Sequence, residues 1–136
     1  MKIIDRLLED KIHISFEVFP PKTDAGYEKV RSATEQIAGL HPSYISVTYG
    51  AGGGTSKNTA KIASYIRDEL GVESLAHLTC ASSTKAEVQT VIENLKALGI
   101  ENILALRGDI PEGMVFPSED RYHYAYELVE AIRRSG

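Results

Sequence analysis

Four polar residues, Glu17, Thr48, His77 and Arg107, recur along the chain at intervals of 31, 29 and 30 residues. Each lies towards the end of a run rich in β-branched and aromatic residues, which is typical of a strand. A carboxylic acid, a hydroxyl, an imidazole and a guanidinium are groups that acid–base catalysis and ligand binding use. We therefore expect these four side chains to line one site.

The elements that would position them alternate along the chain. The expected strands cover residues 13–19, 43–50, 73–80 and 102–107, and the expected helices cover 24–39, 56–70, 85–98 and 121–134. Strict alternation of strand and helix predicts a parallel sheet with helical connections.

The helix predictions rest on spacing and on end signals. Val88, Ile92 and Leu95 follow the period of one buried helical face. Thr84, followed three residues later by Glu87, matches a capping box at the start of the same helix. Gly71 and Gly99 follow two expected helix ends, where a left-handed residue costs least.

Alternating side chains divide each expected strand into an apolar and a polar face. The polar face carries Glu17, Thr48 and His77 in the first three strands. In the fourth strand we expect Leu104 and Leu106 on the apolar face and Ala105 and Arg107 on the polar face. In a barrel one strand face packs on the helices and the other faces the axis. The pattern thus favours an α/β fold of the (β/α)8 TIM-barrel type over an open doubly wound sheet, which is covered on both faces.

The length of the chain limits how much of a barrel it forms. The 136 residues correspond to a single domain, residues 1–136, without a linker. A complete barrel needs roughly 250 residues, so four strand–helix units supply about half of one. The first and fourth strands would then be unpaired edges, which favour association. Two explanations stay open: pairing with a second copy, as a homo-oligomer, or membership of a longer chain.

Composition excludes several other classes of protein. The formal net charge of −4 argues against a nucleic-acid partner, and 43% hydrophobic with 25% charged residues is ordinary for a folded domain. Cys80 is the single cysteine, which excludes an internal disulfide and a cysteine-based zinc site; we expect it to be buried and no metal to be bound. The apolar runs are far shorter than the ~20 residues of a membrane span. A cytoplasmic protein without a membrane partner is therefore expected.

Four motifs carry a family likeness. They are residues 15–22 (SFEVFPPK), 46–50 (SVTYG), 77–80 (HLTC) and 105–109 (ALRGD). Together and in this order they resemble the barrel-only bacterial form of methylenetetrahydrofolate reductase, over the N-terminal half of its catalytic domain. The resemblance implies bound FAD, reduction of the flavin by NAD(P)H, and reduction of 5,10-methylenetetrahydrofolate to 5-methyltetrahydrofolate in one-carbon metabolism and methionine synthesis. NADH and NADPH are not distinguished.

The resemblance also assigns roles to residues. Glu17 matches the family's general acid, which helps to open the folate's five-membered ring; such an acid must hold its proton, and burial in the barrel mouth favours this. Asp109 matches a second catalytic residue close to both flavin and folate, so that Glu17 and Asp109 are also the expected substrate contacts. The matching flavin-binding positions are Thr48, His77, Leu106, Arg107, Gly108, Asp109, Tyr124 and Ala125. Backbone amides at the start of the last helix would be able to hold phosphate oxygens.

Two alternatives to this interpretation stay open. In the first alternative, the chain is a non-catalytic half-barrel module that associates through its strand edges. In the second, the glycine-rich run 50–54 between a strand and a helix would bind a nucleotide, although Thr55 replaces the third glycine of the fingerprint. Single residues also have purely structural interpretations. His77 would then be a hydrogen-bonded histidine of the core, and Arg107 and Asp109 would form a local ion pair.

Overall fold

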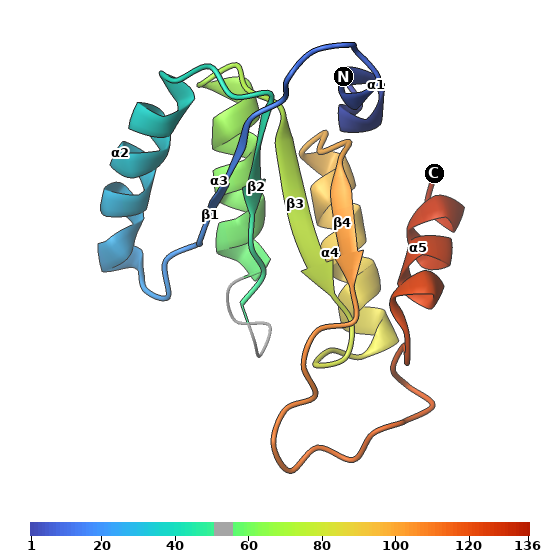
Figure 1. Cartoon of the computed structure of the whole chain (residues 1–136). Coiled ribbons are helices and arrows are strands. Elements are labelled where there is room, and N and C mark those ends of the chain that lie inside the picture. Colours follow the sequence, from blue (N-terminus) through green and yellow to red (C-terminus); the bar gives the residue numbers. More distant parts are fainter. Residues whose placement is uncertain (51–55) are drawn as a thin grey trace.

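The computed structural model describes residues 1–50 and 56–136 as a four-stranded parallel sheet with helices packed on it (Figure 1). In chain order the elements are α1 (Ile3–Leu7), β1 (Ser15–Val18), the 3-10 turn η1 (Asp24–Gly26), α2 (Tyr27–Ala38), β2 (Tyr44–Val47), α3 (Ser56–Asp68), β3 (Ser74–Thr79), α4 (Lys85–Ala97), β4 (Ile103–Leu106) and α5 (Ala125–Arg134). The strands lie side by side in the order β1-β2-β3-β4, as consecutive units of a barrel wall do. The predicted fold class is confirmed: the chain is an α/β structure of about four strand–helix units, in agreement with part of a (β/α)8 barrel.

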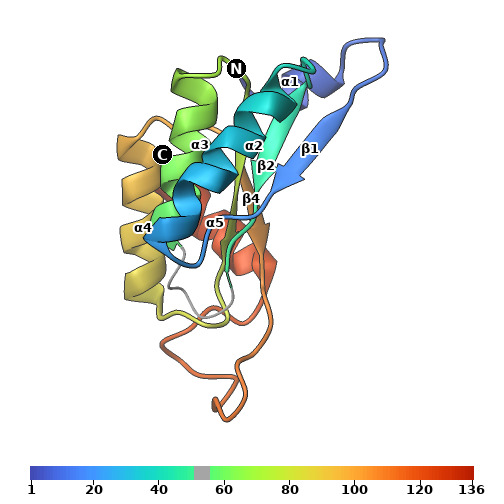
Figure 2. The same ribbon diagram turned by 90° about the vertical axis from the view of Figure 1, so that its left-hand side faces the viewer.

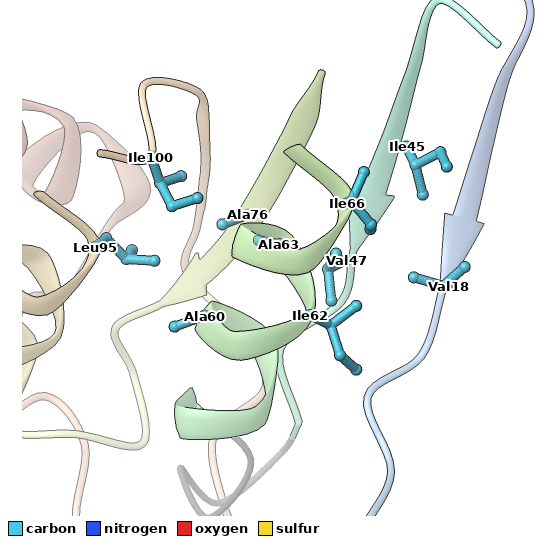
Figure 3. Close-up of a cluster of buried hydrophobic side chains, with 10 residues drawn as sticks. All are labelled: Val18, Ile45, Val47, Ala60, Ile62, Ala63, Ile66, Ala76, Leu95 and Ile100. Carbon is cyan, nitrogen blue, oxygen red and sulfur yellow. The ribbon is translucent and has the colours of Figure 1, made fainter. Parts of the chain in front are cut away.

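Helices α2, α3 and α4 cover one side of the sheet (Figure 2). The core between them is apolar and close-packed, and Figure 3 shows its main cluster. Val47 and Ala76 of the sheet and Ile62 and Ile66 of α3 are almost completely buried there. Complete burial of an isoleucine side chain stabilises a fold by about 1.5–3 kcal/mol, so this layer fixes the position of α3 on β2 and β3.

The predicted end signals of the helices are confirmed. Thr84 Oγ1 accepts from the backbone N–H of Glu87, and Glu87 Oε2 accepts from the backbone N–H of Thr84, which completes the capping box of α4. Gly71 and Gly99 have φ values of 66° and 72°, as expected of residues that end helices in the left-handed region. Cys80 is buried, also as predicted.

The helices differ from the sequence predictions in two places. The last helix begins at Ala125 and not at residue 121, because residues 107–124 form a long loop between β4 and α5. Helix α1 was not predicted; its start is bound to Asn102, whose Oδ1 accepts from Ile3 N at 2.8 Å and whose Nδ2 donates to Met1 O at 3.3 Å. In the described part of the chain, no helix combines the length and apolar character that crossing a membrane requires.

The expected faces of β4 were also wrong. The register pairs Leu104 with His77 and Leu106 with Thr79, so both leucines lie on the same face as the histidine, away from the helices. Ile103 and Ala105 face the helices instead and pack against the buried clusters. Four consecutive apolar residues contain no polar–apolar alternation, and the packing of α5 against this strand therefore decides which pair is buried.

Candidate active site

The polar face of the sheet brings together three side chains from three neighbouring strands. Glu17 of β1, Ser46 of β2 and His77 of β3 meet at one atom, Oε1 of the glutamate. Ser46 Oγ donates to it at 3.3 Å, and His77 Nε2 lies 3.4 Å from it. The cluster lies on the face of the sheet opposite the covering helices, where a barrel would have its axis.

Sheet register explains why these residues meet. Glu17 is directly opposite Ser46 in the parallel pairing of β1 with β2. The expected counterpart, Thr48, lies beyond the end of β2, so the equal spacing along the chain does not correspond to equal height on the sheet. Alternation along the strand puts Ser46 on the same face as Thr48. Nothing in the sequence indicated a role for Ser46, and the missing signal was this register.

Burial differs between the histidine and the glutamate of this cluster. The His77 side chain is 11% exposed, whereas the Glu17 side chain is 49% exposed. Burial lowers the pKa of His77 from its ordinary value, and the Glu17 carboxylate opposes this shift to a smaller extent. The ring is thereby favoured in its neutral form. The expected burial of Glu17 is not present in this chain, because only the sheet itself and its two neighbours shield the carboxyl group.

Residues 106–109 lie at the carboxyl end of β4. Arg107 is exposed, and its carbonyl oxygen accepts from the backbone N–H groups of Cys80 and Ala81 at 3.2 and 2.8 Å. Its side chain was expected on the polar strand face beside His77, but β4 ends before it. Among the described residues Arg107 forms no ion pair with Asp109, and Asp109 forms none with any other side chain. Among the described residues, the structure therefore joins Glu17 to His77 but links neither Arg107 nor Asp109 to them by an ion pair.

Gly108 brings the chain unusually close to β3. Its φ is +79°, and a Cβ added there would lie 2.8 Å from Cβ of Thr79. A side chain at this position would therefore clash with the strand and strain the backbone. The close approach holds the end of β4 beside Thr79 on the open face of the sheet.

The start of α5 does not offer all the amides expected for a phosphate. The backbone N–H groups of His123 and Tyr124 both donate to Glu127 Oε2 at 2.7 Å. These hydrogen bonds lower the pKa of Glu127, and the bond from Tyr124 has the larger effect. A carboxylate therefore already occupies the N-terminus of the helix. Tyr124 is exposed and stacks on Tyr126, and Ala125 is the first helical residue.

The described cavities do not coincide with the polar cluster. One of about 780 Å³ lies at the amino-terminal end of the sheet, between α1, α4 and α5, and is lined by apolar residues such as Ile4, Leu75 and Ile132. None of the cluster residues lines it. The glycine run 50–54 lies, apart from Gly50, outside the described residues.

Comparison with known proteins agrees with the four motifs. The family model described as methylenetetrahydrofolate reductase matches residues 2–136. The chain belongs to the methylenetetrahydrofolate reductase family. It is 37% identical to "Methylenetetrahydrofolate reductase (NADH) 1" of Zea mays over 98% of this chain and 23% of that protein. It is 36% identical to "5,10-methylenetetrahydrofolate reductase" of Escherichia coli (strain K12) over 93% of this chain and 41% of that protein.

The family resemblance predicted from the motifs is thus confirmed, and the chain spans less than half the length of these relatives. Residues of the open face also fit part of a flavin site. Leu104 and Leu106 present apolar surface beside the polar side chains of His77 and Thr79, a combination that suits a ring system with polar edges. The backbone just beyond β4 approaches this surface at Gly108.

Proposed function

We propose that this chain supplies the general acid and part of the flavin site of a reductase that converts 5,10-methylenetetrahydrofolate to 5-methyltetrahydrofolate. FAD is the proposed cofactor, NAD(P)H the proposed reductant, and one-carbon metabolism in the cytoplasm the proposed setting. The observation that carries the proposal is the placement of Glu17 on the open strand face. Ser46 donates a hydrogen bond to its Oε1 and His77 lies beside that atom, whereas no described residue donates a hydrogen bond to Oε2.

The roles of the chain's residues follow from this placement. Bound FAD would supply the hydride chemistry. Glu17 would donate a proton to the folate nitrogen that leaves as the five-membered ring opens. Thr48, His77 and the stretch Leu106–Asp109 are the proposed flavin contacts, and Asp109 is proposed to contact both flavin and folate. Tyr124 and Ala125 are proposed to contact the flavin without the two amides that Glu127 occupies.

Replacement of Glu17 by Gln tests the proposal. The variant keeps the size of the side chain and removes the acid, so the flavin-loaded protein should still be reduced by NADH or NADPH but should lose folate reduction by at least about 100-fold. Glu28→Gln, at an exposed site on α2, is the matched control and should leave both half-reactions unchanged. Stopped-flow absorbance of the flavin measures both steps. Unchanged folate reduction in Glu17→Gln would exclude the acid role.

A second candidate function is favoured by the sheet edges. Neither outer edge of the sheet pairs with another strand in the described part of the chain. Ile12 and Ile14, beside β1, are 90% and 61% exposed. A non-catalytic module that associates with a second copy through these edges would bury this surface, and absence of flavin binding together with stable association would support it.

A further inference from the structure

The hydrogen bond between Ser46 and Glu17 has a consequence for the position of the acidic proton. Ser46 is 7% exposed and lies directly opposite Glu17 in the sheet. Its hydroxyl donates to Oε1, and His77 Nε2 lies 3.4 Å from the same atom. Oε1 is therefore engaged by the protein, whereas no described residue donates a hydrogen bond to Oε2.

A neutral carboxyl group carries its proton on one oxygen and accepts hydrogen bonds at the other. Because Ser46 donates to Oε1, that oxygen is the acceptor, and the proton is placed on Oε2. The same bond limits rotation of the carboxyl group about its last torsion, which is otherwise broad. The proton would then point away from β2 and β3, towards the open side of the sheet.

We propose that Ser46 is a positioning residue for the general acid: its hydroxyl holds Oε1 and so keeps the transferable proton of Glu17 on Oε2. This inference rests on the proposed reductase function. His77 also lies beside Oε1 of Glu17, but its ring is a proposed flavin contact, so that a change at His77 would alter cofactor binding as well. A change at Ser46 tests the positioning of Glu17 alone.

The test compares Ser46→Ala, Ser46→Thr and Ser46→Val in the flavin-loaded reductase that contains this chain. Threonine and valine have the same shape, and only threonine retains the hydroxyl. Loss of one hydrogen bond to the acid should lower kcat for folate reduction about 10-fold in the alanine and valine variants. Ser46→Thr should remain within about threefold of wild type. KM for folate and the rate of flavin reduction by NAD(P)H should not change.

The same kinetic assays measure a control variant and the results that would contradict the proposal. Ser74→Ala removes another buried serine of the sheet, on the face packed against the helices, and should leave kcat unchanged. Equal rates in the threonine and valine variants, or a parallel loss in both half-reactions, would overturn the positioning role. The Glu17→Gln variant distinguishes the two hypotheses. If only the positioning role of Ser46 is wrong, Glu17→Gln still loses folate reduction. If the acid role of Glu17 is also wrong, Glu17→Gln retains folate reduction. If Ser46→Ala does not fold, as judged by circular dichroism, the threonine–valine pair carries the test.

Discussion

Glu17, Ser46 and His77 are separated by about thirty residues each along the chain, yet they meet at one carboxylate oxygen. Their contact requires that three strands keep a fixed register, because a shift by one residue would turn a side chain to the other face. The cluster is therefore a sensitive reporter of the sheet as well as a candidate catalytic group.

The position of Gly108 predicts a large effect of a small substitution. Gly108→Ala should destabilise the fold by more than the about 1–2 kcal/mol that a left-handed alanine costs, because its Cβ also clashes with Thr79. Gly113→Ala is the matched control: its φ is +77°, but apart from its chain neighbours no described residue has an atom within 4 Å of the added Cβ. Urea unfolding of both variants measures the difference. Equal losses in the two variants would show that the contact with Thr79 contributes nothing.

The low pKa of His77 predicts that stability depends on pH. Burial lowers the pKa in the folded state, so the unfolded chain binds a proton at higher pH than the folded one. Stability should therefore fall as the pH decreases through the ordinary histidine range near 6.5. Wild type should lose more free energy of unfolding than His77→Gln between about pH 8 and about pH 5.5. His41→Gln, on the exposed surface, should behave as wild type does, and a wild-type slope in His77→Gln would contradict this cause.

At the scale of single elements, sequence patterns predicted those parts whose signals are local. The capping box at Thr84 and Glu87 and the helix-ending Gly71 and Gly99 depend on neighbouring residues, and all are present. Helix α1 was not predictable in this way, because Asn102, about a hundred residues along the chain, holds its first residues. The faces of β4 were misassigned since ILAL has no polar–apolar alternation.

The same limit applied to the candidate site. Sequence reasoning identified Glu17 and His77 by their type and spacing, and the structure joins them. It missed Ser46, because a serine is ordinary in a strand and its role depends on the register with β1. It also placed Arg107 in the cluster, although β4 ends one residue earlier.

The capping box offers a test of α4 as an element. Thr84→Ala removes the acceptor for Glu87 N and should cost about 1 kcal/mol of stability. Amide exchange in the first turn of α4 should accelerate, since an orphan N–H is released. Thr90→Ala, at an exposed position within the same helix, should change stability by less than about 0.5 kcal/mol. Similar losses in the two variants would mean that loss of the cap does not account for the effect, because within a helix alanine has a higher helix propensity than threonine.

At the scale of the whole molecule, helices cover one face of the sheet, and its two outer strands have no strand partner among the described residues on their outer sides. Helices α2, α3 and α4 cover the apolar side (Figure 2), whereas Leu104 and Leu106 remain partly exposed on the open side. Closing such a wall requires further strands, supplied either by the remainder of a longer chain or by a second copy. The two sources predict different association states for the isolated 136-residue chain.

Association of the isolated chain tests the second source. If a second copy completes the sheet, sedimentation should show a dimer or larger species, because each chain offers both a β1 edge and a β4 edge. Ile14→Lys should convert this species to monomer, since a charge beside an edge strand opposes pairing. Val115→Lys, at an exposed position in the loop before α5, is the control and should leave the association unchanged. A wild-type chain that sediments as a monomer would reject the second copy as the partner and would leave strands of a longer chain as the source of the missing wall.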